Sequence, residues 1–380
     1  MFGVIDFFSY LCKDIYQNKN MKSLSIGGLL VAQPIVQGGM GVGISLSGLA
    51  SAVANEGGVG VISSAGLGLL YKKLSPNFVE AAILGLKEEL RLTREKTQGI
   101  VGVNIMVAMS NFSDMVKTAI QEKIDIIFSG AGMPLDLPSY LVEGAKTKLV
   151  PIVSSARAAK IICEKWWSTY KYLPDAVVVE GPKAGGHLGF KVEQLDDENF
   201  SLERLVPAVC QEIEPFERIN NTKIPVIAAG GLYSGEDIYN IMQLGASGVQ
   251  LGTRFVTTEE CDASLDFKET YINATEEDIK IIKSPVGMPG RAIFNSFMEK
   301  VRNGKKQPFS CPFKCIKTCD ISKSPYCIIT ALFNAFKGNM KGGYAFAGTN
   351  AYRANKIETV KELFAKLKEE FRTEKMRILG

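Results

Sequence analysis

The stretch "IPVIAAGGLYSGEDIYNIMQLGASGVQLGTRF" (224–255) decides the fold class, because its pattern predicts a strand, a helix and a second strand. The two apolar runs, "IPVIAAGG" (224–231) and "ASGVQLGTRF" (246–255), show no polar alternation, which is typical of parallel strands buried on both faces. Between them, "SGEDIYNIMQLG" predicts a helix. Ser234 is its expected N-cap, with Asp237 three residues later completing a capping box.

The same alternation extends toward the N-terminus. Six further apolar runs precede this unit, with helical patterns between them: "PIVQGG" (34–39), "GGVGVISSAG" (57–66), "GIVGVNIMV" (99–107), "IDIIFSGAG" (124–132), "KLVPIVSSA" (148–156) and "DAVVVEG" (175–181). Eight strand–helix units fit a closed (β/α)8 TIM barrel better than a doubly wound sheet, which usually has about five to seven strands. We therefore predict an α/β fold built on such a barrel.

The pattern changes after residue 256, and this change sets the expected domain limits. We expect an N-terminal extension (1–20) and a barrel core (21–256). A small, mostly helical second region (257–350) follows, with a cysteine cluster and an active-site loop. The last part is an amphipathic helix (351–380), in which six apolar residues recur at helical spacing: Ile357, Val360, Leu363, Phe364, Leu367 and Phe371. Such a helix is expected to pack on the barrel surface.

Charge and cysteine content exclude several classes of protein. The net charge of +4 is spread over 44 basic and 40 acidic residues without a basic block, which argues against a nucleic-acid partner. No apolar run approaches ~18 residues, so no membrane span is expected. The opening segment lacks the basic start and small-residue cleavage site of a signal peptide, and eight cysteines without an export signal suggest free thiols. We expect a soluble cytoplasmic protein.

The predicted strand ends are rich in Gly, Ser and Ala and poor in charge. Active sites of TIM barrels lie at these ends, and small residues let a flat ligand approach the backbone and its N–H groups. At the seventh and eighth ends, the N–H groups of Gly230, Gly231, Gly252 and Thr253, with the Thr253 hydroxyl, could surround a phosphate. Alternatively, these glycines only relieve crowding at tight turns. No dinucleotide fingerprint or P-loop occurs, so we predict a different phosphate-bearing flat cofactor.

Six motifs carry a resemblance to a known family: "PIVQGGMG", "GVNIMV", "VVEGPKAGGHLGF", "IPVIAAGG", "QLGTRF" and "SPVGMPGRAI". Their order and spacing resemble the nitronate monooxygenases, also called 2-nitropropane dioxygenases, which are related to the flavin-type enoyl-acyl-carrier-protein reductases. The resemblance covers roughly residues 21–300. It implies an FMN-dependent (β/α)8 barrel with a small second domain from the C-terminal region.

The resemblance also implies a set of cofactor-binding positions. Gly38, Gly39 and Met40 would lie along the flavin ring, and Asn104 would hydrogen-bond the cofactor. Glu180 falls where the family often has a polar flavin-contacting residue, commonly glutamine in the oxygen-using branch. The remaining positions match flavin, ribityl and phosphate contacts: Gly185, Gly186, Gly230, Gly231, Gln250, Leu251, Gly252 and Thr253.

His187 is the only histidine of the chain, and it follows two glycines on a predicted strand-end loop. A lone histidine is often a packing residue, but this location favours a group that titrates near neutral pH and serves catalysis. The resemblance implies that His187 is the catalytic histidine. It would accept a proton from a nitroalkane or hold a nitronate. In the reductase branch it would polarise a thioester carbonyl or deliver a proton.

The resulting functional hypothesis is an FMN-dependent oxidoreductase that oxidises alkyl nitronates with molecular oxygen. One alternative is an enoyl-acyl-carrier-protein reductase that uses NAD(P)H as co-substrate. Another is a non-catalytic flavin-binding redox sensor. The expected partner is a small molecule, a nitronate or an enoyl thioester, and a homodimer is compatible with the sequence.

Half of the cysteines lie within one short segment. Cys311, Cys315, Cys319 and Cys327 follow the spacing C-x3-C-x3-C-x7-C. Four thiolates suffice for zinc or an iron–sulfur cluster, but structural zinc sites favour C-x2-C pairs. On a helix, the first three would form a buried stripe of small side chains. We expect no metal, and these four residues are the only candidates for one.

Overall fold

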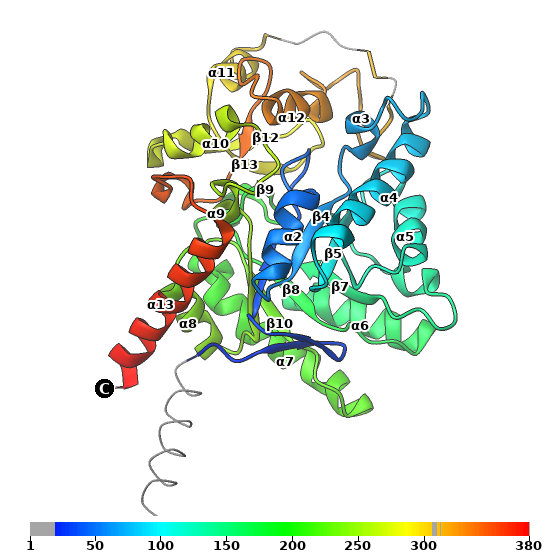
Figure 1. Cartoon of the computed structure of the whole chain (residues 1–380), viewed down its shortest axis with the longest axis vertical. Coiled ribbons are helices and arrows are strands. Elements are labelled where there is room, and N and C mark those ends of the chain that lie inside the picture. Colours follow the sequence, from blue (N-terminus) through cyan, green and yellow to red (C-terminus); the bar gives the residue numbers. More distant parts are fainter. Residues whose placement is uncertain (1–19, 306–309, 312, 380) are drawn as a thin grey trace, which may run out of the picture.

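The computed structural model describes residues 20–305, 310–311 and 313–379 (Figure 1). The expected N-terminal extension (1–20) lies outside the described residues, apart from Asn20. Eight parallel strands form the central sheet: β3 (Ile35–Gln37), β4 (Gly60–Ser63), β5 (Val101–Met106), β6 (Ile126–Gly130), β7 (Lys148–Val153), β8 (Val177–Glu180), β10 (Val226–Ala229) and β11 (Gly248–Leu251). Each of them lies within one of the eight predicted runs.

The sheet closes into a barrel. Its strand order is β3-β11-β10-β8-β7-β6-β5-β4, so every strand pairs with its sequence neighbour and β3 pairs with β11. A parallel bridge between Val36 and Val59 joins the remaining two edges. There the Gln37 N–H donates to the Val59 carbonyl, and the Val59 N–H donates to the Ile35 carbonyl, both at 2.9 Å. The predicted (β/α)8 barrel is confirmed.

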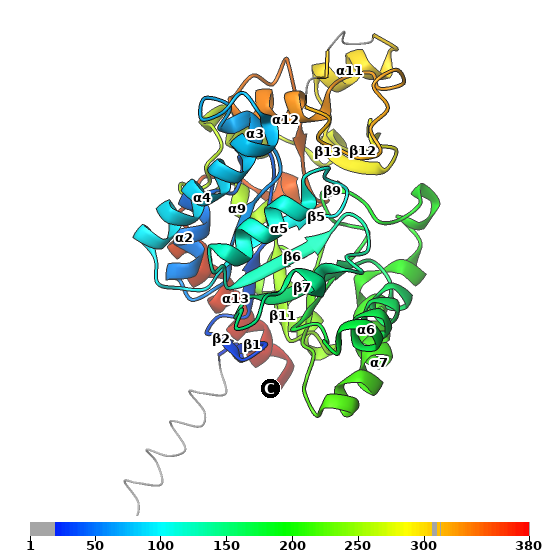
Figure 2. The ribbon, with the colours of Figure 1, turned by 90° about the vertical axis from the view of Figure 1, so that its right-hand side faces the viewer.

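Helices surround the barrel (Figures 1 and 2). They are α2 (Ser47–Asn55), α3 (Leu67–Leu70), α4 (Phe78–Lys96), α5 (Phe112–Gln121), α6 (Ala156–Tyr170), α7 (Leu202–Asn220), α8 (Gly235–Gln243) and α9 (Thr253–Val256). After β6, a 3-10 turn, η1 (Leu137–Tyr140), takes the place of an α-helix. The predicted capping box of α8 is present, because the Ser234 hydroxyl accepts from the Asp237 N–H and the Asp237 carboxylate accepts from the Ser234 N–H.

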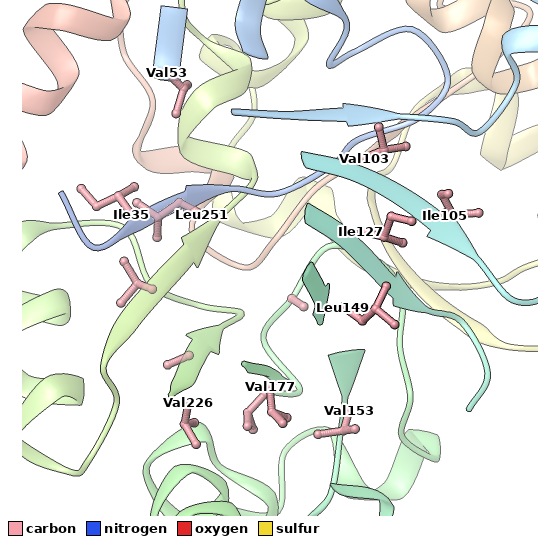
Figure 3. Close-up of a cluster of buried hydrophobic side chains, with 14 of the residues drawn as sticks. Ile35, Val53, Val103, Ile105, Ile127, Leu149, Val153, Val177, Val226 and Leu251 are labelled. Carbon is pink, nitrogen blue, oxygen red and sulfur yellow. The ribbon is translucent and has the colours of Figure 1, made fainter. Parts of the chain in front are cut away.

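Two apolar layers form because successive strand residues face opposite sides. Val103 and Ile105 of β5 lie in the outer layer between strands and helices, together with Ile127 and Val177 of other strands (Figure 3). Asn104 stands between Val103 and Ile105 in the sequence and therefore faces the interior. The alternation thus turns the single polar residue of β5 toward the barrel axis.

The inner layer fills the barrel below the strand ends. Phe128, Val178 and Ile227 belong to it, and so do Leu24 and Ile26 of a short hairpin. This hairpin, β1 (Leu24–Ile26) and β2 (Leu29–Val31), lies at the end of the barrel opposite to the second region (Figures 1 and 2). The N-terminal mouth is therefore plugged, and a ligand has to enter from the other end.

The second region lies across the carboxyl ends of the barrel strands (Figures 1 and 2). Its helices are α10 (Leu265–Ile272), α11 (Ser296–Arg302) and α12 (Ile328–Phe336). It also contains an antiparallel sheet that the sequence did not predict, formed by β12 (Ile279–Lys283), β13 (Pro289–Ile293) and β14 (Ala345–Phe346). A two-residue strand from the barrel loop, β9 (Gly186–His187), pairs with β13. Short 3-10 turns complete the chain: η2 (Val192–Gln194), η3 (Glu198–Phe200), η4 (Glu276–Asp278) and η5 (Ala351–Arg353).

The C-terminal helix α13 spans Val360–Leu379, so it begins nine residues after the start of the expected segment (351–380). Its buried side chains include Leu363, Leu367 and Phe371. The Phe371 ring packs edge-on against Tyr239 of α8 at 5.4 Å, and Figure 1 shows α13 beside α8. Within the described ranges, no helix combines the length and hydrophobicity that a membrane crossing requires.

Candidate active site

A cavity of about 610 Å³ opens at the carboxyl ends of the barrel strands, between the barrel and the second region. This volume is in the range of small-molecule and cofactor sites. All fourteen residues predicted for catalysis or cofactor binding line it: Gly38, Gly39, Met40, Asn104, Glu180, Gly185, Gly186, His187, Gly230, Gly231, Gln250, Leu251, Gly252 and Thr253. The structure therefore brings the whole predicted set to one cavity.

Gly38 and Gly39, which follow β3 and have no side chains, form the first wall of the cavity. Its direction is set by a 2.8 Å hydrogen bond from the Gly38 N–H to the Leu251 carbonyl. A Cβ at Gly39 would lie 2.4 Å from the Cβ of Asn104, so this position has no room for a larger residue. A flat, bare surface results, next to the Asn104 amide.

Leu251 contributes to the cavity in a different way from the other predicted residues. Its side chain is 2% exposed and lies in the outer apolar layer beside Ile35 (Figure 3). Its carbonyl is already bonded to Gly38. Leu251 therefore shapes the wall through its main chain, and its side chain faces away from any ligand.

Three polar side chains converge on the cavity without protein partners. Asn104, Glu180 and Gln250 come from the ends of β5, β8 and β11, and among the described residues no hydrogen bond to their side chains is present. All three residues are partly exposed, and they border the open cavity. Their arrangement therefore fits a ligand that offers several hydrogen-bonding atoms.

Glu180 lies deep in the molecule, although its carboxyl still borders the open cavity. Burial raises the pKa of this carboxyl from 4.5 to about 7. Near neutral pH the group thus exists in both forms, and its protonated form can donate a hydrogen bond. The resemblance leads us to expect glutamine at this position, and a glutamine side chain can donate a hydrogen bond there as well.

The end of the cavity at β10 and β11 is built from glycine and one hydroxyl. Gly230 and Gly231 have φ angles of +93° and +86°, a left-handed conformation that favours glycine. The Asn350 amide donates to the Gly231 carbonyl at 2.6 Å, and the Gly348 N–H donates to the Thr253 hydroxyl oxygen at 2.9 Å. No described residue accepts a hydrogen bond from the Thr253 hydroxyl, so this hydroxyl can donate to an anionic group.

His187 is half-buried and held on three sides by the second region. Its main chain pairs with Gly290 of β13 in antiparallel register. Its Nε2 lies 2.7 Å from the Ser284 hydroxyl oxygen, and its ring meets Phe346 edge-on at 5.0 Å. The imidazole is therefore fixed in orientation while it lines the cavity.

Burial lowers the pKa of His187 from 6.5 to about 4. No carboxylate forms an ion pair with this histidine among the described residues, so nothing offsets the cost of a buried charge. This corrects the expectation of a group that titrates near neutrality. At pH 7 the imidazole is neutral and can accept a proton.

Three residues that support the site were not singled out from the sequence. The buried Arg291 guanidinium donates to the carbonyls of Pro182 and Ala184 at 2.6 and 2.7 Å, which fastens the loop before His187. Arg291 and Ser284 both belong to the motif "SPVGMPGRAI", and Phe346 lies in the glycine-rich loop "GGYAFAGTNAYR". The motif marked the segment, but only the fold shows which of its residues reach the site.

The cysteine segment lies at a second cavity, apart from the active-site cavity. Cys311, Cys315, Cys319 and Cys327 all line this space of about 370 Å³ as free thiols. Residues 313–327 contain no helix, so the expected stripe on a helix face is wrong. In the described part of the chain, no group of three or more ligating side chains lies close enough together to hold one metal ion.

A family model described as nitronate monooxygenase matches residues 22–370. The chain belongs to the nitronate monooxygenase family. Its members are flavin-dependent oxidoreductases acting on small molecules, and this chain is one of them. The probable nitronate monooxygenase of Bacillus subtilis is 28% identical, over 78% of this chain and 85% of that protein.

Other proteins to which the chain is similar are not named nitronate monooxygenases. The (3aS,4S,5R,7aS)-5-hydroxy-7a-methyl-1-oxo-octahydro-1H-indene-4-carboxyl-CoA dehydrogenase of Mycobacterium tuberculosis is 29% identical, over 73% of this chain and 67% of that protein. The structure of FabK from Thermotoga maritima covers 92% of this chain and 96% of its own, with a TM-score of 0.70 and 28% identity. A nitroalkane oxidase from Streptomyces ansochromogenes has a TM-score of 0.69 over 91% of this chain and 97% of its own; at 19% identity it shows the shared fold only.

Proposed function

We propose that this member of the nitronate monooxygenase family binds FMN in the active-site cavity and oxidises small alkyl nitronates with molecular oxygen. The observation that carries the proposal is the convergence of a side-chain-free glycine wall, three unpaired polar groups and one oriented histidine on a single cavity. These features fit FMN, which has a flat ring, a polar ring edge and a terminal phosphate. When bound, FMN supplies the two-electron redox chemistry.

The protein's own groups would divide the binding task. Gly38, Gly39 and Met40 would lie along the ring, while Asn104 and Glu180 would hydrogen-bond to it. Gly185, Gly186 and Gln250 would continue this contact, and the main chain at Leu251 and Gly252 would complete the wall. The N–H groups of Gly230 and Gly231 with the Thr253 hydroxyl would bind the phosphate. Two observations support this assignment. All of these groups border the cavity, and the side chains of Asn104, Glu180 and Gln250 form no hydrogen bond with any described residue.

His187 would act on the substrate rather than on the cofactor. Its low pKa keeps the imidazole neutral at pH 7, so it can hydrogen-bond a nitronate oxygen, whereas toward the carbon of a nitroalkane it would act only as a weak base. The hydrogen bond with Ser284 and the contact with Phe346 would orient the ring during this step. In our division of the chain, the second region (257–350) would thereby supply the groups that orient His187 in the site of the barrel core (21–256).

A second candidate function is the reduction of an enoyl thioester with NAD(P)H as co-substrate. The coenzyme A thioester in the name of the Mycobacterium tuberculosis relative favours it, as does the resemblance to flavin-type enoyl reductases. In that reaction His187 would hydrogen-bond the thioester carbonyl or deliver a proton. The two candidates differ in what reduces the flavin: the nitronate itself, or NAD(P)H.

Anaerobic stopped-flow absorbance tests the two candidates on the same purified protein. Ethyl nitronate, NADH and NADPH are mixed with it in parallel, and bleaching of the flavin is followed. Rapid bleaching by ethyl nitronate supports the nitronate reaction. Bleaching by NADH or NADPH alone supports the reductase, and a flavin that none of them bleaches would contradict both and favour the redox sensor.

A further inference from the structure

Four cysteines that are not needed for the oxidoreductase site converge on one cavity. Cys311, Cys315, Cys319 and Cys327 line a space of about 370 Å³, although residues 313–327 contain no helix. A helix would have aligned the first three of them by its periodicity alone. Because no helix is present, their convergence is a property of the loop fold itself.

The backbone of this segment is fastened to the barrel. Met109 and Ile316 form an antiparallel bridge. On one side of it the Ser110 N–H donates to the Cys315 carbonyl at 3.1 Å, and on the other the Lys317 N–H donates to the Ala108 carbonyl at 3.0 Å. Cys315 is thus held against the loop that follows β5. A thiol fixed in this way loses little conformational freedom on binding a metal centre.

Four thiols can bind either a single zinc ion or an iron–sulfur cluster, and the two kinds of site require different distances between the sulfurs. Four Zn–S bonds of about 2.3 Å at tetrahedral angles would bring the sulfurs to about 3.8 Å from each other. Among the described residues, no group of three or more ligating side chains could hold a single metal ion. In a [4Fe–4S] cluster each cysteine binds a different iron atom, so the four cysteine sulfurs lie farther apart around a larger inorganic core. A cavity of about 370 Å³ that four thiols line has room for such a core.

The charges at the cavity also favour an anionic centre. Lys314 and Lys317 line it together with the four cysteines. The Lys317 ammonium is tied to the Val107 carbonyl at 2.9 Å, which keeps a positive charge at this place. Positive charges beside the cavity would partly offset the negative charge of a cluster bound by four thiolates.

The segment leads directly into a wall of the active-site cavity. Cys327 is the N-cap residue of α12 (Ile328–Phe336). Leu332 of this helix lines the active-site cavity, five residues or about 7.5 Å of helix further on. A centre bound at Cys327 would therefore fix the start of a helix that borders the site.

We propose that Cys311, Cys315, Cys319 and Cys327 bind an iron–sulfur cluster that holds the second region against the barrel. The four thiols lose their protons as they bind iron, and inorganic sulfide supplies the bridging atoms. The proposal is independent of the substrate of the oxidoreductase site, because it concerns a different cavity.

The test is the metal and sulfide content of the full chain purified without oxygen. We expect about four iron and four acid-labile sulfide per chain, the content of one [4Fe–4S] cluster. The protein is then reduced with dithionite and examined by electron paramagnetic resonance. Fully reduced flavin is silent in this measurement, so a cluster signal is distinguishable from FMN.

The double variant Cys311→Ser/Cys319→Ser should lose iron, sulfide and signal. The matched variant Cys210→Ser, a cysteine that does not line this cavity, should keep all three. If the double variant does not fold, the content of the wild-type chain still decides the matter. One zinc per chain, a disulfide between these cysteines, or neither iron nor sulfide after anaerobic reconstitution would overturn the proposal.

Discussion

The Nε2 of His187 lies 2.7 Å from the Oγ of Ser284, although 97 residues separate them in the sequence. Ser284 is 3% exposed and directly follows β12, whereas His187 belongs to the loop after β8. This contact joins the barrel to the second region at the point where both border the active-site cavity. The orientation of the single imidazole therefore depends on both parts of the chain.

Ser284→Ala should lower kcat about 3- to 10-fold, because the lost hydrogen bond is worth about 0.5–1.5 kcal/mol and orients the imidazole. KM should change less than kcat, since no substrate contact is removed. Steady-state kinetics with the accepted substrate check this prediction. Ser139→Ala, at an exposed serine outside the cavity, is the control and should behave like the wild type. An unchanged kcat in Ser284→Ala would show that the contact does not orient a reacting group.

His187→Ala should keep the fold and the bound flavin, because main chain and glycines form most of the cofactor wall. The rate of flavin reduction by substrate should fall by roughly 10²- to 10⁴-fold, the usual contribution of a positioned acid–base group. Anaerobic stopped-flow of the variant and the wild type measures this rate. Near wild-type reduction would mean that the histidine only packs against Phe346.

The lowered pKa of His187 predicts a pH dependence of stability. Between about pH 6.5 and 4 the unfolded chain binds a proton at this histidine and the folded chain does not. The free energy of unfolding should therefore fall as the pH is lowered through this window and be unaffected by the group above it. Replacement by glutamine should remove this component. Urea denaturation of the flavin-free wild type and His187→Gln from pH 4 to 8 compares them, and parallel curves would contradict the lowered pKa.

Gly231→Leu should abolish FMN retention. A side chain there would be strained at a φ of +86° and would meet the Cβ of Lys183 at 2.7 Å, next to the proposed phosphate site. The flavin content of the purified variant measures the effect. Gly144→Leu is the matched control, because Gly144 has a φ of +78° but does not line the cavity. A fully flavin-loaded Gly231→Leu protein would contradict the proposed position of the phosphate.

Arg254→Ala should lower the free energy of unfolding by about 3–5 kcal/mol, because it leaves a buried carboxylate without its main partner. The Arg254 guanidinium lies 2.5 Å from the Glu358 carboxylate, and both side chains are 4% exposed. This pair joins α9 to the segment before α13. Chemical denaturation measures the loss. Arg91→Ala, which breaks an exposed pair with Glu88, is the control and should leave the stability nearly unchanged.

The sequence by itself determined the barrel and the edge at which its site lies. Strands buried on both faces are mostly apolar, so β10 is visible as an uninterrupted run of valine, isoleucine and alanine. Backbone that has to come close to a ligand requires glycine, so the strand ends are visible as well. Both the burial of a strand and the need for glycine at its end restrict residues that are close together in the sequence. The sequence pattern therefore predicts them.

Only the tertiary structure decided which groups support His187 and what its protonation state is. The contact with Ser284 and the pairing with Gly290 depend on how the second region folds over the barrel. The pKa of about 4 depends on how much water the surrounding walls exclude. The convergence of the four cysteines on one cavity has the same origin, because residues 313–327 contain no helix whose periodicity could align them. Proximity across the fold and burial arise from the packing of distant segments, and no local spacing of residues specifies them.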